Sequence, residues 1–346
     1  DTLTYVNSAE ICAQAGKALI CDDDDVQAPP LLEPALAVTK TASDVMDNGN
    51  GTFSVTFTIV TENTGNVQAN NMAISDDIAS GFGSHVASVA NVGEYQIDNI
   101  TQDLIAGDAI PTGGNVITLN PNFDGDGVNA SGDVDINQAA ITEILGVGDS
   151  VTHTITITFY PNLNDSSLDY GNAAAACTGE GEDAVCDEDN TETNPPFTTS
   201  LETTKTAGEV TDNENGTFDV NFTINLTNTG NIPLTGLSII DNISAGFGTY
   251  NATGPATVGE YGLSTITIVP DDKLLGDLSI ALDGNFEGQN ITEMLDLTAP
   301  NLLGVTDGVD LIFTVTYYPD LTNPNLGYGN AVTACVDNPL SEEKIC

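Results

Sequence analysis

The sequence predicts an all-β fold, because its longest patterned segments alternate in the way that strands do. Four runs alternate apolar with polar side chains, at the period of a strand with one buried face: residues 52–61, 150–160, 217–227 and 310–318. Thr, Val, Ile, Phe and Tyr dominate these runs, as is typical of strands. Clusters of Asp, Asn, Glu and Gly at residues 47–51 and 212–216 indicate turns before two of them.

The chain also repeats itself. Three motifs recur at an offset of 165 residues: NGTF at 50–53 and 215–218, NTGN at 63–66 and 228–231, and IASGFG at 78–83 with ISAGFG at 243–248. Two units, each with several strands separated by turns, predict two tandem β-sandwich domains with immunoglobulin-like packing.

The N-terminus carries a further copy of the end of the repeat. Three groups of residues match: Tyr5, Asn7, Cys12 and Cys21; Tyr170, Asn172, Cys177 and Cys186; and Tyr328, Asn330, Cys335 and Cys346. We therefore expect an extra N-terminal strand beside the two sandwiches. The expected division is 1–34 for the terminal strand of a preceding or neighbouring domain plus an acidic linker, 35–186 for repeat 1, 187–199 for an acidic linker and 200–346 for repeat 2.

The charge excludes several classes of function. Asp and Glu number 51 against five Lys and Arg, which gives a formal net charge of -46. Such a chain cannot neutralise a nucleic-acid backbone, and an anionic membrane surface would repel it. No apolar run is long enough to span a membrane. We expect no enzyme, because His85 and His153 have no counterpart in the other repeat and the chain has no Trp for a sugar-binding platform.

The repeated motifs resemble the "conserved repeat domain" (domain of unknown function eleven) of bacterial and archaeal surface proteins. The resemblance rests on Lys-Thr in the first strand, Thr-Asn-Thr-Gly-Asn at 227–231, the aspartates in 74–78 and 239–243, and the closing Gly-Asn-Ala. It covers residues 35–177 and 200–335. It implies extracellular, tandemly arrayed sandwich domains and no enzyme. The paired cysteines and the insert near Phe123 depart from the family pattern.

The six cysteines form three local pairs. Cys12 with Cys21 and Cys177 with Cys186 are separated by eight residues, and Cys335 with Cys346 by ten. An even number of cysteines at matching repeat positions predicts three disulfides and an oxidising compartment. Zinc is the alternative, but the pairs lack the nearby histidines that would complete a tetrahedral site.

Acidic residues suggest calcium binding in one loop and in the segments that follow the cysteine pairs. Asn122, Asp124, Asp126 and Asp133 approximate the alternating oxygen ligands of a calcium loop, with a glycine at its sixth position. Weaker candidates follow the cysteine pairs: Asp22, Asp24, Asp187 and Asp189. The alternatives are an acidic surface hairpin and solvated linkers.

Lys40 and Lys205 occupy one repeat position, and the period of two places Lys40 on the same face as Leu36 and Val38. A lysine facing a core is costly unless it is paired or consumed. Pilin-like sandwiches can join such a lysine to an asparagine of the last strand by an isopeptide bond. The candidates are Lys40 with Asn172 and Lys205 with Asn330, with Asp76 or Asp241 as the acid. The alternative is a lysine that pairs with this acid or extends to solvent.

Asn-x-Ser/Thr sequons offer sites for glycosylation. The candidates are Asn50, Asn99, Asn129, Asn164, Asn215, Asn242, Asn251 and Asn290. Two more, Asn221 and Asn225, fall in an expected strand.

Two functions remain after these exclusions. The first is a structural subunit or segment of an extracellular filament or cell-surface stalk, with copies of itself or adjoining repeats arranged head to tail. The second is an adhesin whose loops bind a glycan or a protein, with the insert at 120–135 as the candidate binding loop. Residues 1–21 either finish an upstream domain of a longer chain or add a strand to a neighbouring subunit.

Overall fold

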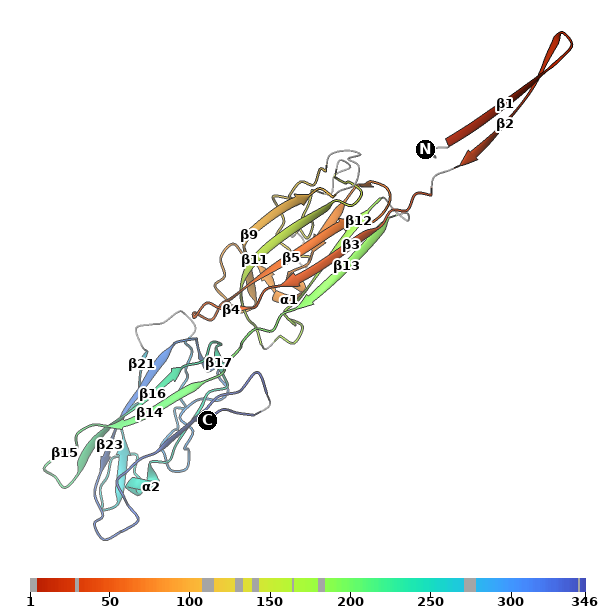
Figure 1. Ribbon diagram of the computed structural model, residues 1–346. Coiled ribbons are helices and arrows are strands. Elements are labelled where there is room, and N and C mark those ends of the chain that lie inside the picture. Colours follow the sequence, from red (N-terminus) through yellow and green to blue (C-terminus); the bar gives the residue numbers. More distant parts are fainter. Residues whose placement is uncertain are drawn as a thin grey trace.

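The computed structural model describes residues 5–28, 31–107, 115–127, 133–138, 143–163, 165–179, 184–270, 278–341 and 343–346. The protein is all-β, as the sequence predicts, and in these residues its only helices are two single turns, α1 (Ala79–Phe82) and α2 (Ser244–Phe247). Figure 1 shows an N-terminal hairpin, a first β unit and a second β unit that follow one another along the molecule.

The main sheet of the first unit has the strand order β3-β5-β11-β9-β8, with β4 paired to β5. All of its pairs are antiparallel except β8 with β9. The strands are β3 (Leu36–Ala42), β4 (Met46–Asp47), β5 (Phe53–Asn63), β8 (Ser84–His85), β9 (Glu94–Ile105) and β11 (Ser150–Tyr160).

The second sheet of this unit has the order β13-β12-β7, and the short strands β6 and β10 form a separate pair. The bounds are β6 (Ala69–Asn70), β7 (Ala73–Asp76), β10 (Ile144–Leu145), β12 (Gly171–Thr178) and β13 (Val185–Glu192). The strand β13 corrects one expectation. Residues 187–192 are not part of a linker, because their backbone pairs with β12 from Gly171 to Ala176.

The second unit repeats this plan. Its main sheet has the order β14-β16-β23-β20-β19, with β15 on β16 and β21 on β23, while β17 pairs with β22 and β18 with β24. The main-sheet strands are β14 (Leu201–Ala207), β15 (Thr211–Asp212), β16 (Phe218–Asn228), β19 (Thr249–Tyr250), β20 (Glu260–Leu263), β21 (Thr267–Pro270) and β23 (Gly308–Tyr317). The others are β17 (Leu234–Thr235), β18 (Ser238–Asp241), β22 (Leu302–Leu303) and β24 (Val332–Cys335).

Each unit has its own hydrophobic core. In β5 the buried and half-buried residues alternate, so that Phe53, Val55, Phe57 and Ile59 face the core. The opposite sheet contributes residues such as Ile74 to the same cluster. The second core is built in the same way from β16, β18 and β23. Alternation along the strands therefore produces two sandwich-like units, because each sheet buries the face that carries its apolar residues.

The two units meet at a packed junction. The ring of Phe197 lies 5.2 Å from that of Phe53, edge to face. Ile232 of the second unit is fully buried and belongs to the core cluster of the first. The side chain of Asn231 donates a hydrogen bond to Asp47 at 2.8 Å. The segment between the units is therefore anchored by apolar and polar contacts.

The N-terminal segment forms a two-stranded hairpin. Strands β1 (Tyr5–Ala15) and β2 (Ala18–Ala28) pair antiparallel along their whole length. The expectation of one strand followed by an acidic linker was therefore wrong, since Asp22 to Asp25 lie within β2. Figure 1 shows the hairpin extending away from the first unit.

All three predicted disulfides are confirmed. Cys12 bonds to Cys21, Cys177 to Cys186 and Cys335 to Cys346, and the described residues include no free cysteine. The first two bridges join residues directly opposite each other in a hairpin, so each fixes the register of its two strands.

Candidate functional site

Each unit brings a lysine, an aspartate and an asparagine together at the same three repeat positions; all three are buried in the first unit, whereas Lys205 and Asn330 of the second are half-buried. In the first unit, Lys40 lies on β3, Asp76 ends β7 and Asn172 lies on β12. Their exposed fractions are 3%, 1% and 4%. The three side chains that the sequence singled out are therefore brought together between the two sheets, whereas the covalent bond between them stays a prediction.

One carboxylate oxygen joins the three side chains of the first unit. Lys40 Nζ donates to Asp76 Oδ2 at 2.6 Å, and Asn172 Nδ2 donates to the same oxygen at 3.4 Å. Asp76 Oδ1 and Asn172 Oδ1 are buried and have no hydrogen-bond partner among the described residues. Because the amine and the amide both contact Oδ2, they are close neighbours.

The second unit has the same arrangement. Lys205 Nζ donates to Asp241 Oδ2 at 2.5 Å, and Asn330 Nδ2 donates to that oxygen at 3.3 Å. The side chain of Lys205 is 8% exposed and that of Asp241 is fully buried. In the described part of this unit, Asp241 Oδ1 and Asn330 Oδ1 again lack partners.

Aromatic rings lie beside both amines. Lys40 Nζ lies 5.1 Å from the ring centroid of Phe57, and Lys205 Nζ lies 5.0 Å and 5.5 Å from those of Phe222 and Phe313. These rings stabilise a cation weakly through their faces and exclude water from it. The aromatic surroundings were not predicted, although the repeated strand pattern that contains Phe57 and Phe222 offered the signal.

Burial shifts the two charges toward neutrality. It lowers the pKa of Lys40 and raises the pKa of Asp76, because the charged forms lose their hydration, while the attraction between the two groups opposes both shifts. Lys205 and Asp241 shift in the same directions for the same reason. Both shifts favour transfer of a proton from the lysine to the carboxylate, and that transfer would make the amine a nucleophile.

A single helical turn positions the asparagine of each site. Tyr170 N donates to Gly81 O of α1 at 3.2 Å, and a Cβ on Gly81 would lie 1.9 Å from Gly171 O. Tyr170 itself has a φ of 57°, which is uncommon outside glycine. Because this contact immediately precedes Asn172, it sets where β12 begins.

The second unit repeats this contact, with Tyr328 N on Gly246 O at 3.2 Å and a φ of 50° at Tyr328. The glycine shared by IASGFG and ISAGFG therefore has a structural role, because it allows the turn to approach the segment that carries the asparagine.

The expected calcium loop uses its carboxylates on its own backbone. Asp124 Oδ1 accepts the N–H groups of Asp126 at 3.1 Å and Asp133 at 2.7 Å, and Asp133 Oδ1 accepts that of Asp135 at 3.0 Å. Asn122 is exposed. Among the described residues, only Glu10, Cys12 and Cys21 bring three potential metal ligands together, and both of those sulfurs are in a disulfide. In the described residues, calcium would have to compete with these backbone N–H groups for Asp124 and Asp133.

The acidic residues after the cysteines also contact backbone. Asp187 Oδ2 accepts Val38 N at 2.6 Å, and Asp189 Oδ2 accepts Lys40 N at 2.8 Å, so both attach β13 to β3. Asp22 and Asp24 occupy the same register positions in the N-terminal hairpin, where they are exposed. The structure therefore assigns Asp187 and Asp189 a role in strand association.

Calcium binding stays a prediction with a direct test. If one site binds Ca²⁺ at a free concentration 100-fold above its Kd, the free energy of unfolding rises by about 2.7 kcal/mol. Thermal melting at low ionic strength, with calcium and with a chelator, measures this difference. Equal melting midpoints would contradict the prediction.

The candidate glycosylation sites divide into three groups. Five are exposed: Asn50, Asn99, Asn215, Asn242 and Asn290. Asn251 is half-buried, and its Oδ1 accepts the N–H and the hydroxyl of Thr253. Asn129 and Asn164 lie outside the described residues. Glycosylation stays a prediction for these sites.

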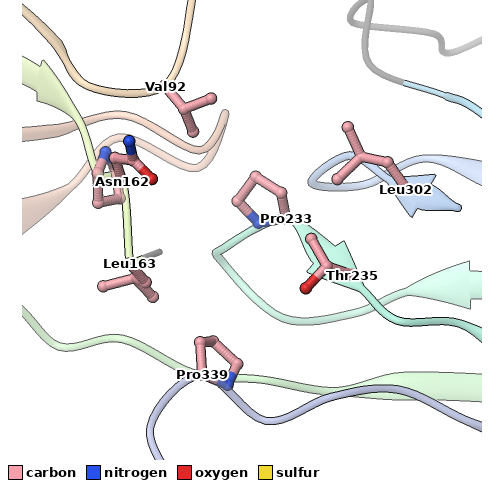
Figure 2. Close-up of a pocket in the computed structure, with 8 residues that line it drawn as sticks. Val92, Asn162, Leu163, Pro233, Thr235, Leu302 and Pro339 are labelled. Atoms are coloured by element: carbon pink, nitrogen blue, oxygen red, sulfur yellow. The ribbon is translucent and has the colours of Figure 1, made fainter. Parts of the chain in front are cut away.

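A pocket lies at the junction of the two units. Figure 2 shows Val92, Asn162 and Leu163 on one side of it and Pro233, Thr235, Leu302 and Pro339 on the other. The eighth lining residue is Pro161, and none of the eight side chains can be titrated. The pocket offers mainly apolar contacts, with Asn162 and Thr235 as its polar side chains.

A scan of protein-family models and a search of curated proteins found no match to this chain. No helix in the described part of the chain is both long and apolar enough to cross a membrane.

Proposed function

We propose that this chain is a structural segment of an extracellular filament or surface stalk, in which copies of the chain or adjoining repeats follow one another head to tail. The observation that carries the proposal is the hairpin β1–β2. Its Ile11 occupies the repeat position of Ala176, which is fully buried in the first core, yet Ile11 is 78% exposed. An apolar residue at a core position with no core around it favours docking on another unit.

The equivalent hairpin in the first unit supports this reading. There β12 pairs with β7, while β13 lies beside β3 and accepts its N–H groups through Asp187 and Asp189. The cysteines of the N-terminal hairpin pair in the same way as those of β12 and β13. Asn7 also precedes Cys12 by five residues, just as Asn172 precedes Cys177. Its sequence is therefore that of a sandwich component.

The second unit offers a matching edge. Thr203 and Lys205 of β14 correspond to Val38 and Lys40 of β3. Among the described residues, no carboxylate stands beside their backbone N–H groups as Asp187 and Asp189 do beside β3. The alternate residues of β14 are accordingly half-buried, where those of β3 are buried. Strand β2, with Asp22 and Asp24 at the register positions of these two aspartates, has the chemistry to cover this edge.

The disulfides and the charge support an extracellular location. Three disulfides suit a secreted or surface protein, because cytosolic thiols are kept reduced. The formal net charge of -46 keeps the surface well solvated, and copies would associate only where salt screens their repulsion.

The test is whether the hairpin controls assembly. In about 0.15 M salt, where the screening length is about 8 Å, light scattering should show concentration-dependent oligomers, and electron microscopy should show linear chains. The variant Ile11→Asn with Val26→Asn should remain monomeric, because both apolar residues lie exposed on the hairpin. The matched control is Leu321→Asn, which alters an 89% exposed residue of the second unit and should assemble normally.

Two results would contradict the proposal. One is assembly that is unchanged by the hairpin variant or by deletion of residues 1–28. The other is a wild-type chain that stays monomeric at every concentration and salt level tested.

A further inference from the structure

We propose that each unit contains an intramolecular isopeptide bond, between Lys40 and Asn172 in the first and between Lys205 and Asn330 in the second, formed with the help of Asp76 and Asp241. The inference concerns covalent structure within one chain, so it does not depend on how chains assemble.

The geometry places a nucleophile beside an electrophile. In each unit the lysine Nζ and the asparagine Nδ2 contact one and the same aspartate oxygen. The lysine is on the first strand of one sheet, whereas Asn172 is on β12 of the opposite sheet and Asn330 lies two residues before β24. The bond would therefore tie the two layers of the sandwich together across the core.

A simple salt bridge explains this arrangement less well. A buried ion pair is worthwhile only when further hydrogen bonds satisfy its remaining polar atoms. Here Asp76 Oδ1 and Asn172 Oδ1 have no partner among the described residues, although both are buried. The same two atoms are without described partners in the second unit. In the product, the N–H of the new amide could donate to one oxygen of a protonated aspartate. The carbonyl of the amide could accept the O–H of the other.

The reaction balances without any co-reactant. A proton moves from the Lys40 ammonium to Asp76, and the neutral Nζ attacks Cγ of Asn172. A bond forms between Nζ and Cγ, and the bond between Cγ and Nδ2 breaks. Asp76 takes a proton from the attacking nitrogen and gives one to the leaving nitrogen, which departs as ammonia. Nothing is oxidised or reduced. Asp76 begins as a carboxylate and ends protonated, because it keeps the proton that the Lys40 ammonium lost.

Burial provides the two conditions for this chemistry. Phe57 in the first unit, and Phe222 with Phe313 in the second, lie beside the amine, and burial of the amine disfavours its charged form. Two strands fixed in packed sheets hold the reacting groups together, which replaces a bimolecular encounter with an intramolecular one.

Intact-mass spectrometry of the folded, secreted chain tests the proposal. After reduction and alkylation of the cysteines, the chain should be lighter than its sequence by about 34 Da, because each bond releases about 17 Da of ammonia. Proteolysis and tandem mass spectrometry should then yield one branched peptide that contains Lys40 and Asn172 and another that contains Lys205 and Asn330.

Variants separate the two bonds. Lys40→Met, Asp76→Ala or Asn172→Ala should each reduce the deficit to about 17 Da, because only the second unit can then react. Asn172→Asp retains a reactive carbonyl and should restore a bond through loss of water in place of ammonia. Lys344→Met removes a surface lysine and is the matched control, whose deficit should stay at about 34 Da.

The mass of the folded wild-type chain shows by itself whether the bonds form. The test therefore does not depend on whether every variant folds. A wild-type mass equal to that of the sequence overturns the proposal for both units. A deficit of one ammonia overturns it for the unit that yields no branched peptide. A full deficit that persists in Lys40→Met overturns the assignment to Lys40.

Discussion

Asp76→Ala should lower the free energy of unfolding of the first unit by about 3–5 kcal/mol, the cost of leaving a buried charge without its partner. Lys40 is 3% exposed and its Nζ contacts the Asp76 carboxylate at 2.6 Å. The mutant must either bury an unpaired ammonium group or deprotonate it. Denaturant melts of the wild type and the variant measure the difference.

A surface pair provides the control for this result. Lys344 and Asp337 form an ion pair at 3.0 Å, but their side chains are 54% and 55% exposed. Asp337→Ala should therefore cost less than about 1 kcal/mol, because water and salt screen the pair. If Asp76→Ala cost no more than Asp337→Ala, the buried pair would have no structural importance.

The double variant Lys40→Met with Asp76→Leu distinguishes a salt bridge from a covalent bond. If Lys40 and Asp76 form only an ion pair, replacing both with apolar side chains of similar size should be close to neutral or stabilising. If Lys40 is bonded to Asn172, the double variant loses a crosslink as well. Its stability should then stay well below that of the wild type, since the unfolded chain gains the freedom that the crosslink removed.

The sequence was sufficient to predict the buried lysine sites because strand geometry leaves few alternatives. The period of two places Lys40 on the face that carries Leu36 and Val38, and the structure buries all three. The match between Lys40 and Lys205 shows that the position is part of the repeat. What the sequence could not supply was the single-turn helix that brings Gly81 against Gly171, because that contact depends on tertiary packing.

Two acidic segments that resemble linkers in sequence are strands in the structure. Residues 187–192 and 22–25 have the polarity of a solvated linker, yet both lie in strands. Their sheet hydrogen bonds are made by the backbone, and the disulfide at Cys177 and Cys186 holds β13 to β12 whatever its side chains. An edge strand needs little apolar surface, so hydrophobic patterning alone does not reveal it.

The acidic loop at Asp124 and Asp133 shows a related ambiguity. The spacing of Asp124 and Asp133 matches that of metal ligands, but carboxylates can equally accept the N–H groups of a tight loop. The choice depends on where the backbone places its donors, and residue spacing does not fix that placement.

His153 should make the stability of the first unit depend on pH between about 4 and 6.5. Its side chain is fully buried in β11, and burial lowers its pKa to about 4. Its Nε2 lies 3.1 Å from Gln102 Oε1, so Nε2 carries the proton of the neutral ring. Within this pH window the unfolded chain binds a proton that the folded chain does not. Stability is therefore complete above the ordinary pKa and falls as the pH drops, by about 3 kcal/mol once both states are protonated.

The second unit supplies the variant that tests this effect, because a fully buried Leu311 occupies the matching position in β23. His153→Leu removes the titrating ring and keeps an apolar residue of core size. Many carboxylates also titrate in this range, but they are common to both proteins and cancel when the two pH profiles are subtracted. Denaturant melts from pH 4 to 8 should show that the wild type loses about 3 kcal/mol more than the variant on acidification. Parallel profiles would mean that His153 is protonated in the folded state despite its burial.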